Sequence, residues 1–529
     1  MRRYLIILTA ISLIALWPFF KKGYFESHDG EWMVIRFTAF HQTLASGQFP
    51  VRFVDRLNNN YGYPVLNFLY PLPFYLAEIP KLLGFGFVDS IKSIFILSSV
   101  FSVVAMFWAL SIVFNKKASL TGAILYLFVP YRFVDLYVRG SFGENLAFLF
   151  IPLITGSIFK IAKGKKIFIP PLSISIACLI LSHNVISILF LPFFIIFSLL
   201  VAPKAKLEIF KSFILGVLTA AFFWLPAIYD LKFVKLSQIK VSEIPDHLVT
   251  LFRIITPTWG YGPSPNRPDG LSVQVGIVSA FILISCLILV LTKRAKEKVV
   301  IFQVLVALVS ILLMTKISLP FWQMVPYADV IQFPWRLLAM IVFIQAFLAA
   351  YLINISKNKG LVSTLVIIAA VVSTITYTKP QNFVDRGDGY YSTNEDTTTV
   401  RDEYLPLWVK EKPPKRAERN FELHGKGEIE HVIPTFTDYR AYITTSEKIE
   451  VKFNKIFFPG WQVKINGQTT RIDYQNQSGL ITFNLPKGTS EVIIKYGKTP
   501  IHLVSEIISL VAIFITGIYF YILWRKRNS

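Results

Sequence analysis

The chain has 529 residues and a formal net charge of +22; 54% of its residues are hydrophobic and only 16% are charged. A soluble domain carries roughly 25% charged residues, so this composition excludes an ordinary soluble enzyme. Apolar runs long enough to cross a bilayer, about 17–25 residues each, recur along most of the chain. The sequence therefore predicts a polytopic α-helical membrane protein.

About twelve apolar runs are the expected transmembrane helices. They cover residues 4–20, 91–114, 118–130, 145–159, 167–181, 185–201, 212–228, 274–292, 299–315, 334–356, 361–377 and 503–524. All but the last fall in a membrane domain predicted over residues 1–377, and the last belongs to a carboxy-terminal segment, residues 501–529. Cys178 and Cys286 lie inside apolar runs, where we expect small buried side chains rather than disulfide or metal chemistry.

The placement of charge predicts the orientation. With the amino terminus inside, the short loops that fall in the cytoplasm hold 20 Lys and Arg against Glu208 and Glu297, a net of +18. This asymmetry follows the positive-inside rule and argues against a nucleic-acid partner. We expect a cell (inner) membrane protein with both termini in the cytoplasm. The long loops expected outside are residues 21–90, 131–144, 229–273, 316–333 and 378–502.

The first outer loop, residues 21–90, is the expected catalytic loop and begins with "FESHDGEWMVIRF". Residues 32–44 are predicted to form a short helix along the membrane interface. The apolar side chains at helical spacing are Val34, Phe37, Phe40 and Leu44. Asp29 and Glu31 lie at its start. A carboxylate there is favoured by the helix dipole, so Asp29 has a capping alternative and Glu31 the alternative of a solvated side chain.

Ionisable groups recur at the outer ends of other predicted spans: Arg132, Asp135, Arg139, Glu144, His183 and Arg336. Burying a charged side chain at the end of a membrane span costs free energy, so such residues are usually paired or functional. Arg139 has a structural alternative as a brace to Asp135 or Glu144, and His183 has the alternative of a hydrogen-bonded packing residue. Together, these groups indicate a site at the outer face.

Sugar transfer from a lipid phosphate is the chemistry that such a site suits. Arginines bind the phosphate and neutralise the charge that develops on it, and the candidate donor ligands are Arg139, Arg336, His183 and Arg132. Inversion by direct displacement needs one carboxylate as general base. Asp29 is the candidate base, with Glu31 orienting it or binding acceptor or metal.

The sequence was searched for nucleotide-binding and metal-binding motifs, which would indicate a cofactor. GxGxxG, GxxxxGK[ST] and HExxH are absent from the sequence, so nucleotide and zincin chemistry have no support. His28, Asp29 and Glu31 suit a divalent metal by residue type, but no fourth ligand is identified. We predict no definite cofactor and keep a divalent metal as an alternative. His28 and Trp32 are candidate acceptor contacts.

The polar stretch after the membrane domain contains two regions. Residues 378–424 are an outer linker, mostly loop, in which "DEYLPLWV" is expected to anchor back onto the membrane domain. Residues 425–500 alternate apolar and polar, which predicts a small extracytoplasmic antiparallel β-sandwich. Asn466-Gly467 and Pro486-Lys487-Gly488 are predicted hairpin turns. Trp461 is expected to fill the sandwich core, with a sugar-stacking role as the alternative.

Acidic residues straight after the first span, interfacial helices and many spans resemble the GT-C superfamily of integral membrane glycosyltransferases. The segments "HDGEW", "NNNYGYPVLNFLYPLPFYL", "YRFVDLYVRGSFGE", "LSHNV", "QFPWRLL" and "DEYLP" are similar to a bacterial membrane family named after a 6-pyruvoyl-tetrahydropterin synthase-related domain. The tail is similar to that of YfhO-like membrane proteins. The resemblance implies a GT-C-like fold, a catalytic acid at Asp29 or Glu31, and a polyprenyl-phosphate-linked sugar as donor.

The resemblance also implies an acceptor, which is a glycan, lipid or protein of the cell envelope, and it implies contact with membrane lipids.

Two other classes of function are alternatives to a transferase. A transporter or flippase of lipid-linked glycans would also use arginines at the membrane mouth, but internal repeats and mid-membrane polar groups are expected of it. A non-catalytic envelope scaffold explains the β-domain but gives Asp29, Glu31 and the arginines no role.

Overall fold

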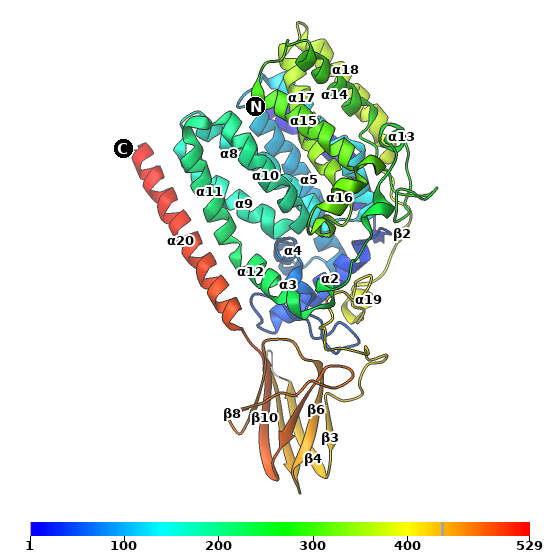
Figure 1. Cartoon of the computed structure of the whole chain (residues 1–529), viewed down its shortest axis with the longest axis vertical. Coiled ribbons are helices and arrows are strands. Elements are labelled where there is room, and N and C mark those ends of the chain that lie inside the picture. Colours follow the sequence, from blue (N-terminus) through cyan, green and yellow to red (C-terminus); the bar gives the residue numbers. More distant parts are fainter. Residues whose placement is uncertain (1, 435–437, 529) are drawn as a thin grey trace.

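The computed structural model describes residues 2–434 and 438–528, most of them in helices (Figure 1). The helices up to residue 377 are α1 (Arg2–Ala15), α2 (Gly30–Ala45), α3 (Val65–Phe68), α4 (Leu72–Leu82), α5 (Phe87–Leu110), α6 (Lys116–Leu127), α7 (Pro130–Phe133), α8 (Phe142–Ala162), α9 (Ile169–Ser182), α10 (Asn184–Val201), α11 (Lys206–Thr219), α12 (Ala221–Asp230), α13 (Leu251–Ile255), α14 (Ile277–Leu291), α15 (Lys298–Leu313), α16 (Leu319–Met324), α17 (Leu338–Ile355) and α18 (Lys359–Thr374). Two more follow, α19 (Asp388–Thr393) and α20 (Pro500–Asn528).

Each of the twelve predicted runs contains a helix, but the expected number of spans is not confirmed. In residues 2–434 and 438–528, 6 helices are long and apolar enough to cross a membrane, or up to 7 if α11 and α12, which are bent by 63°, form one broken span. The remaining runs form α1, α6, α9, α14 and α15. The longest of these five, α15, has 16 residues, about 24 Å at 1.5 Å per residue, whereas a bilayer core is about 30 Å thick.

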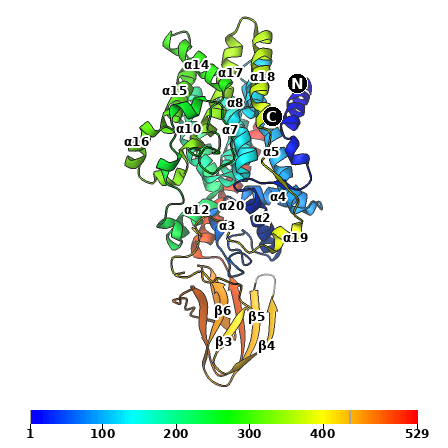
Figure 2. The same cartoon turned by 90° about the vertical axis from the view of Figure 1, so that its right-hand side faces the viewer.

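The helices form one body, with α5 packed on α8, α6 on α17 and α9 on α11, while α20 lies at its edge against α11 and α12. Both termini lie at the end of this body that is far from the β-strands (Figures 1 and 2). A mostly helical chain with candidate membrane helices and a separate β-sheet region is thus confirmed.

The β-sheet region consists of two antiparallel sheets. Its strands are β3 (Phe421–His424), β4 (Gly427–Pro434), β5 (Asp438–Thr445), β6 (Ile449–Ile456), β7 (Trp461–Ile465), β8 (Gln468–Thr470), β9 (Leu480–Leu485) and β10 (Gly488–Tyr496). The order is β4-β5-β10-β7-β8 in one sheet and β3-β6-β9 in the other. A shared apolar core, including Val451, Phe453, Ile481 and Val492, lies between the two sheets.

One predicted turn of the β-region is confirmed and one is wrong. Asn466 and Gly467, with φ of 49° and 83°, connect β7 to β8 as a two-residue hairpin. Pro486-Lys487-Gly488 does not close a hairpin, because β9 pairs with β6 whereas β10 pairs with β5 and β7. The turn carries the chain from one sheet to the other.

The linker covers the helix that follows Asp29. Strand β2 (Phe383–Val384) pairs with β1 (Tyr24–Phe25). The side chain of Arg36 on α2 donates to Thr398 Oγ1 at 2.9 Å, and Thr38 Oγ1 donates to the Tyr391 carbonyl at 3.0 Å. The predicted helix is therefore present, but most of it, from Met33 to Phe40, is buried under other elements rather than lying open along the interface.

The first outer loop also contacts the β-sandwich. Phe53 and Phe68 belong to the apolar core of the sandwich. Lys455 on β6, which is 1% exposed, donates its ammonium hydrogens to the carbonyls of Asp55 at 3.1 Å and Asn60 at 2.7 Å. A buried lysine that binds two backbone carbonyls fixes the sandwich against this loop.

Candidate functional site

The segment that carries Asp29 is held by backbone hydrogen bonds to a π-helical turn, η2 (Val134–Arg139). The amides of His28 and Asp29 donate to the carbonyls of Val138 at 2.9 Å and Arg139 at 2.8 Å. η2 ends at Gly140, whose φ is +62°, and a Cβ there would lie 2.4 Å from Ser27 Oγ. Only glycine permits so close an approach in this left-handed conformation.

Asp29 and Glu31 have different environments. Glu31 is occupied: its carboxylate pairs with Arg386 at 2.6 Å and accepts a hydrogen bond from the Tyr390 hydroxyl at 2.6 Å. Asp29 occupies the N-cap position of α2, as its capping alternative expects, but its side chain makes no cap hydrogen bond. Within the described residues, its carboxylate has no ion-pair partner within 4.0 Å, although it interacts electrostatically with Arg139 and Arg336.

Arg139 is the centre of a buried cluster. Its guanidinium lies 2.7 Å from the Asp135 carboxylate and 2.6 Å from that of Glu144. Tyr131 donates its hydroxyl to the other oxygen of Glu144 at 2.6 Å. Arg139 is 3% exposed and carries two carboxylate partners. The brace expected as its alternative role is what the contacts show.

Arg132 is also buried, but it has no carboxylate partner within the described part of the chain. Its side chain is 0% exposed, its guanidinium lies 4.2 Å from the ring centre of Phe148, and it donates to Asn145 Oδ1 at 3.2 Å. A guanidinium with no exposed surface cannot contact a donor. The expected donor-binding role of Arg132 is therefore not retained.

Arg336 differs from Arg139 in its partners and from Arg132 in being 7% exposed. It donates to the Ile331 carbonyl at 3.0 Å and to Gln332 Oε1 at 2.8 Å, and its Nε has no partner among the described residues. No carboxylate in residues 2–434 or 438–528 lies within 4.0 Å of it. Among the described residues, Arg132 and Arg336 thus both keep a positive charge that no carboxylate neutralises by direct contact, and of the two only Arg336 has any exposed surface.

His183 is 5% exposed and lies at the N-cap of α10. Its Nδ1 accepts the amide hydrogen of Ile186 at 3.2 Å, which places the proton of the neutral ring on Nε2. Burial lowers the pKa of His183 below its usual range, so the ring is neutral at physiological pH. Its packing role is explicit, because it stacks on Tyr70 with ring centres 5.1 Å apart.

The predicted acceptor contacts are dispersed. His28 Nε2 lies 2.8 Å from the Tyr261 carbonyl, which ties it to another loop, and Trp32 is half-buried beside Arg36. Trp461 is 5% exposed in the sandwich core, the placement favoured from the sequence. Within the described residues, no group of three His, Cys, Asp or Glu side chains is arranged to hold a metal ion.

Arg386 and Tyr390 are the site residues that the sequence analysis missed. Both belong to the linker, and Tyr390 is 359 positions from Glu31. Neither lies in a motif or at a periodic position that would connect it with the first outer loop. The strand alternation of "NFVD" at β2 is too short to predict its pairing with β1.

The contact between Glu31 and Arg386 gives a first prediction. Glu31→Gln is expected to speed amide hydrogen exchange in residues 386–393 by up to about fivefold, because a half-exposed ion pair contributes about 1 kcal/mol or less. Lys22→Gln is the matched control, since Lys22 pairs with Asp385 at 2.8 Å but is almost fully exposed. Unchanged exchange in Glu31→Gln would show that this contact does not hold the linker.

Comparison with models of known protein families finds no match, so the similarity to the synthase-related and YfhO-like families is not confirmed. An uncharacterized protein of Lactococcus lactis subsp. cremoris strain MG1363 is 27% identical over 252 residues, which cover 43% of this chain and 40% of that protein. The chain thus matches less than half of the relative's length.

Two solved structures of glycosyltransferases are similar in part. The mycobacterial arabinofuranosyltransferase AftD aligns with a TM-score of 0.45 and 14% identity, over 74% of this chain and 28% of AftD. The Archaeoglobus fulgidus oligosaccharyltransferase in its apo form aligns with a TM-score of 0.41 and 13% identity, over 74% of this chain and 56% of that enzyme. Both TM-scores are below 0.5, and this chain spans less than two thirds of either protein.

Proposed function

We propose that this protein is a membrane glycosyltransferase of GT-C type, which transfers a sugar from a polyprenyl-phosphate donor to an envelope glycan, lipid or protein. The observation that supports this most is the pairing state of the charged groups around η2. Among residues 2–434 and 438–528, Asp29 is a carboxylate without a cation in direct contact, and Arg336 is a guanidinium without a carboxylate in direct contact. A base and an anion-binding group are thus left unneutralised at one end of the helical body.

In the proposed reaction, Asp29 accepts the proton of the acceptor hydroxyl as its oxygen bonds to the anomeric carbon. The bond from that carbon to the donor phosphate oxygen breaks, and its electron pair leaves with the phosphate. Arg336 donates hydrogen bonds to the phosphate oxygens, which carry more negative charge as the bond breaks. One displacement inverts the anomeric carbon, and no second carboxylate is needed as nucleophile.

The contacts favour Asp29 over Glu31 as the base. A general base must be free to accept a proton within hydrogen-bond reach of the acceptor. Glu31 already accepts hydrogen bonds from Arg386 and Tyr390, so its oxygens are occupied and are not free to receive the acceptor proton. We assign to Glu31 the role of holding the linker beside the site.

We further propose that the β-sandwich end lies outside the cell membrane and both termini lie in the cytoplasm. The basic segments at residues 2–3, 293–298 and 525–527 support this orientation, because positive loops are retained inside. Both termini also lie at the end of the helical body far from the sandwich (Figure 1). The Asp29 site then faces donors in the outer leaflet.

The test uses full-length protein in lipid nanodiscs, with a panel of polyprenyl-phosphate sugars and candidate glycan acceptors. Release of polyprenyl phosphate that depends on the acceptor supports transfer. Movement of an intact labelled donor between leaflets without release would identify a transporter instead. If no donor is either cleaved or moved between leaflets, the result would favour a scaffold.

Arg336 gives a second prediction within the same assay. Arg336→Gln is expected to raise the KM for the donor at least about tenfold, since it removes a charge-assisted contact to phosphate. Arg132→Gln is the comparison, because Arg132 is fully buried and should alter stability rather than donor KM. Equal effects of the two substitutions on donor KM would contradict the role assigned to Arg336.

A further inference from the structure

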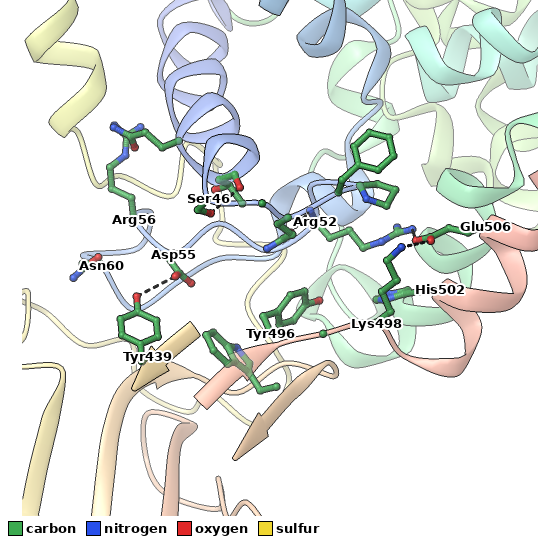
Figure 3. Close-up of a pocket in the computed structure, with 18 residues that line it drawn as sticks. Ser46, Arg52, Asp55, Arg56, Asn60, Tyr439, Tyr496, Lys498, His502 and Glu506 are labelled. Carbon is green, nitrogen blue, oxygen red and sulfur yellow. Dashed lines mark hydrogen bonds and ion pairs between the residues drawn. The ribbon is translucent and has the colours of Figure 1, made fainter. Parts of the chain in front are cut away.

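A cavity of about 470 Å³ lies where the β-sandwich meets the helical body (Figure 3). Residues of the first outer loop, of β10 and of the start of α20 line it, among them Arg52, Tyr496 and Glu506. Close-packed side chains resist displacement, whereas a segment beside a cavity can move into it. The first outer loop therefore has room to shift at Arg52 if the contacts that hold this residue are lost.

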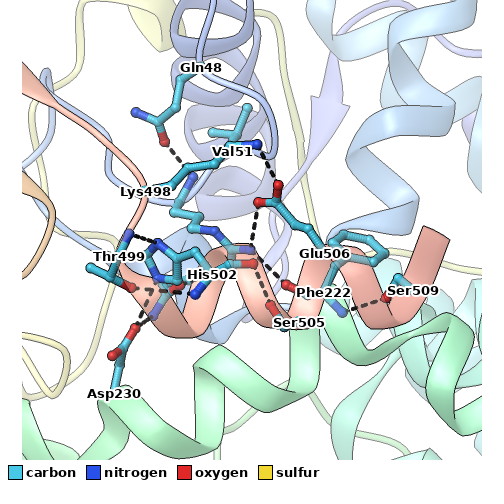
Figure 4. A network of polar contacts seen from close by, with 12 residues as sticks. Gln48, Val51, Phe222, Asp230, Lys498, Thr499, His502, Ser505, Glu506 and Ser509 are labelled. Carbon is cyan, nitrogen blue, oxygen red and sulfur yellow. Dashed lines mark hydrogen bonds and ion pairs between the residues drawn. The ribbon is translucent and has the colours of Figure 1, made fainter. Parts of the chain in front are cut away.

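The helix pair α11 and α12, which contacts Arg52, is bent by 63°, and a side chain of α20 closes the break (Figure 4). In a continuous helix the Phe222 amide would donate to the Leu218 carbonyl. Here the Phe222 amide donates to Ser509 Oγ of α20 at 2.8 Å, and the Ser509 hydroxyl donates to the Leu218 carbonyl at 3.2 Å. One hydroxyl thus takes the place of the helical hydrogen bond at the bend.

The local sequence does not force this bend. Residues 219–222, "TAAF", contain neither proline nor glycine, and alanine is the strongest helix former. Sharp bends without proline are found where a side chain inserts into the helical hydrogen bonds. Inside a membrane every backbone group needs a partner, and a bent or a straight span provides one for both Leu218 and Phe222. The same segment can therefore adopt either arrangement.

The carbonyl of Phe222 is bound by the first outer loop. Pro226 lies four residues further along α12 and has no N–H to donate to this carbonyl. Arg52 Nη2 donates to it instead, at 2.7 Å. The Arg52 guanidinium also donates to Asn67 Oδ1 at 3.2 Å and lies 3.6 Å from the Glu506 carboxylate of α20. Phe222 therefore connects α20 with the first outer loop.

The other end of α12 contacts the same two elements. The Asp230 carboxylate accepts a hydrogen bond from Asn67 Nδ2 at 2.9 Å and lies 3.3 Å from His502 Nε2 of α20. Asp230 and His502 are both 1% exposed. Because α12 contacts α20 and the first outer loop at both of its ends, a change in its direction has to move these contacts.

We infer that α11 and α12 form a hinge, that the Ser509 hydroxyl holds this hinge bent, and that the bent hinge fixes the first outer loop through Arg52. When the hydroxyl is withdrawn, the Phe222 amide bonds to the Leu218 carbonyl and the span straightens. The Phe222 carbonyl then moves away from Arg52, and the loop that begins with the Asp29 segment loses this anchor. The carboxy-terminal helix thus controls the position of the first outer loop.

The bend is measured by double electron–electron resonance on full-length protein in nanodiscs. The spin labels are placed at Leu207 on α11 and Ile228 on α12, which are 58% and 65% exposed, after Cys178 and Cys286 have been replaced by alanine. At about 1.5 Å per residue, these positions are about 27 Å apart across the 63° bend and about 31 Å apart in a straight helix. Ser509→Ala is expected to lengthen the distance by about 4 Å.

The position of the loop is measured by amide hydrogen exchange in the same protein. Ser509→Ala is expected to speed exchange in residues 48–56 about tenfold, because the loop loses the hydrogen bond from Arg52 to the Phe222 carbonyl. Arg52→Gln removes this bond from the side of the loop. It is expected to speed exchange in residues 48–56 by a similar factor, while the distance between the two labels stays short.

Ser505→Ala is the matched control, because Ser505 is 0% exposed and its hydroxyl donates to the His502 carbonyl of its own helix at 2.9 Å. It should change neither measurement, and Ser509→Thr, which keeps the hydroxyl, should keep the bend. The inference is overturned by an unchanged distance in Ser509→Ala, by a longer distance without faster exchange, by a longer distance in Arg52→Gln, or by equal effects of Ser505→Ala. Neither measurement uses a donor or an acceptor, so the result is independent of the proposed function.

Discussion

Asp29→Asn is expected to lower the rate of acceptor-dependent polyprenyl phosphate release by about 10²–10⁴-fold, the usual contribution of a general base. Asparagine has the size of aspartate but cannot take the acceptor proton. The fold should be unaffected, because within the described residues the Asp29 side chain makes neither a cap hydrogen bond nor an ion pair within 4.0 Å. Single-turnover release from a labelled donor, with the melting temperature measured on the same sample, checks both statements.

Glu31→Gln is the comparison for this experiment. It is expected to retain most of the activity, because Glu31 pairs with Arg386 and Tyr390 and is assigned to the linker contact. If Glu31→Gln abolished release and Asp29→Asn did not, the two roles would have to be exchanged. If both lost it equally, the linker contact would be needed to form the site.

Arg139→Met should produce the largest loss of stability in the helical domain, about 3–5 kcal/mol, because it leaves two buried carboxylates without their cation. The carboxylates of Asp135 and Glu144 lie 2.7 and 2.6 Å from the guanidinium and are 1% and 0% exposed. Thermal unfolding in detergent would detect the change as a lower melting temperature.

A compensating variant separates bracing from substrate binding. Adding Asp135→Asn and Glu144→Gln to Arg139→Met removes the unpaired charges, so most of the lost stability should return. If Arg139 only braces the site, the triple variant should also keep its affinity for the donor. A triple variant that is stable but no longer binds donor would return Arg139 to the set of phosphate ligands.

The sequence predicted the positions of the helices better than it predicted their lengths. Each of the twelve apolar runs contains a helix because a long apolar stretch in a membrane has to satisfy its backbone internally. The run at 212–228 is divided by a 63° bend near Ala220, which no proline or polar residue at that position announces. Strand positions were likewise predictable from alternation, whereas the division of β9 and β10 between two sheets was not.

The candidate site was predictable in its residue types but not in its pairing. The gathering of charged residues at the ends of the predicted spans followed from the free-energy cost of burying charge. Which arginine is neutralised depends on side-chain directions in η2, and which carboxylate is neutralised depends on partners far along the chain, such as Arg386 for Glu31. Those contacts are tertiary, and no local pattern encodes them.

The pairing of β1 with β2 has a consequence during synthesis. Phe25 emerges early, but its partner Phe383 is made much later. At 5–20 residues per second, the ribosome needs roughly 20–70 s to cover that interval. Throughout it, the edge of β1 and the Glu31 carboxylate have no linker to bind. A nascent chain that contains all helices up to α18 therefore still lacks the linker contacts of β1 and Glu31, and these form only once the linker has been translated.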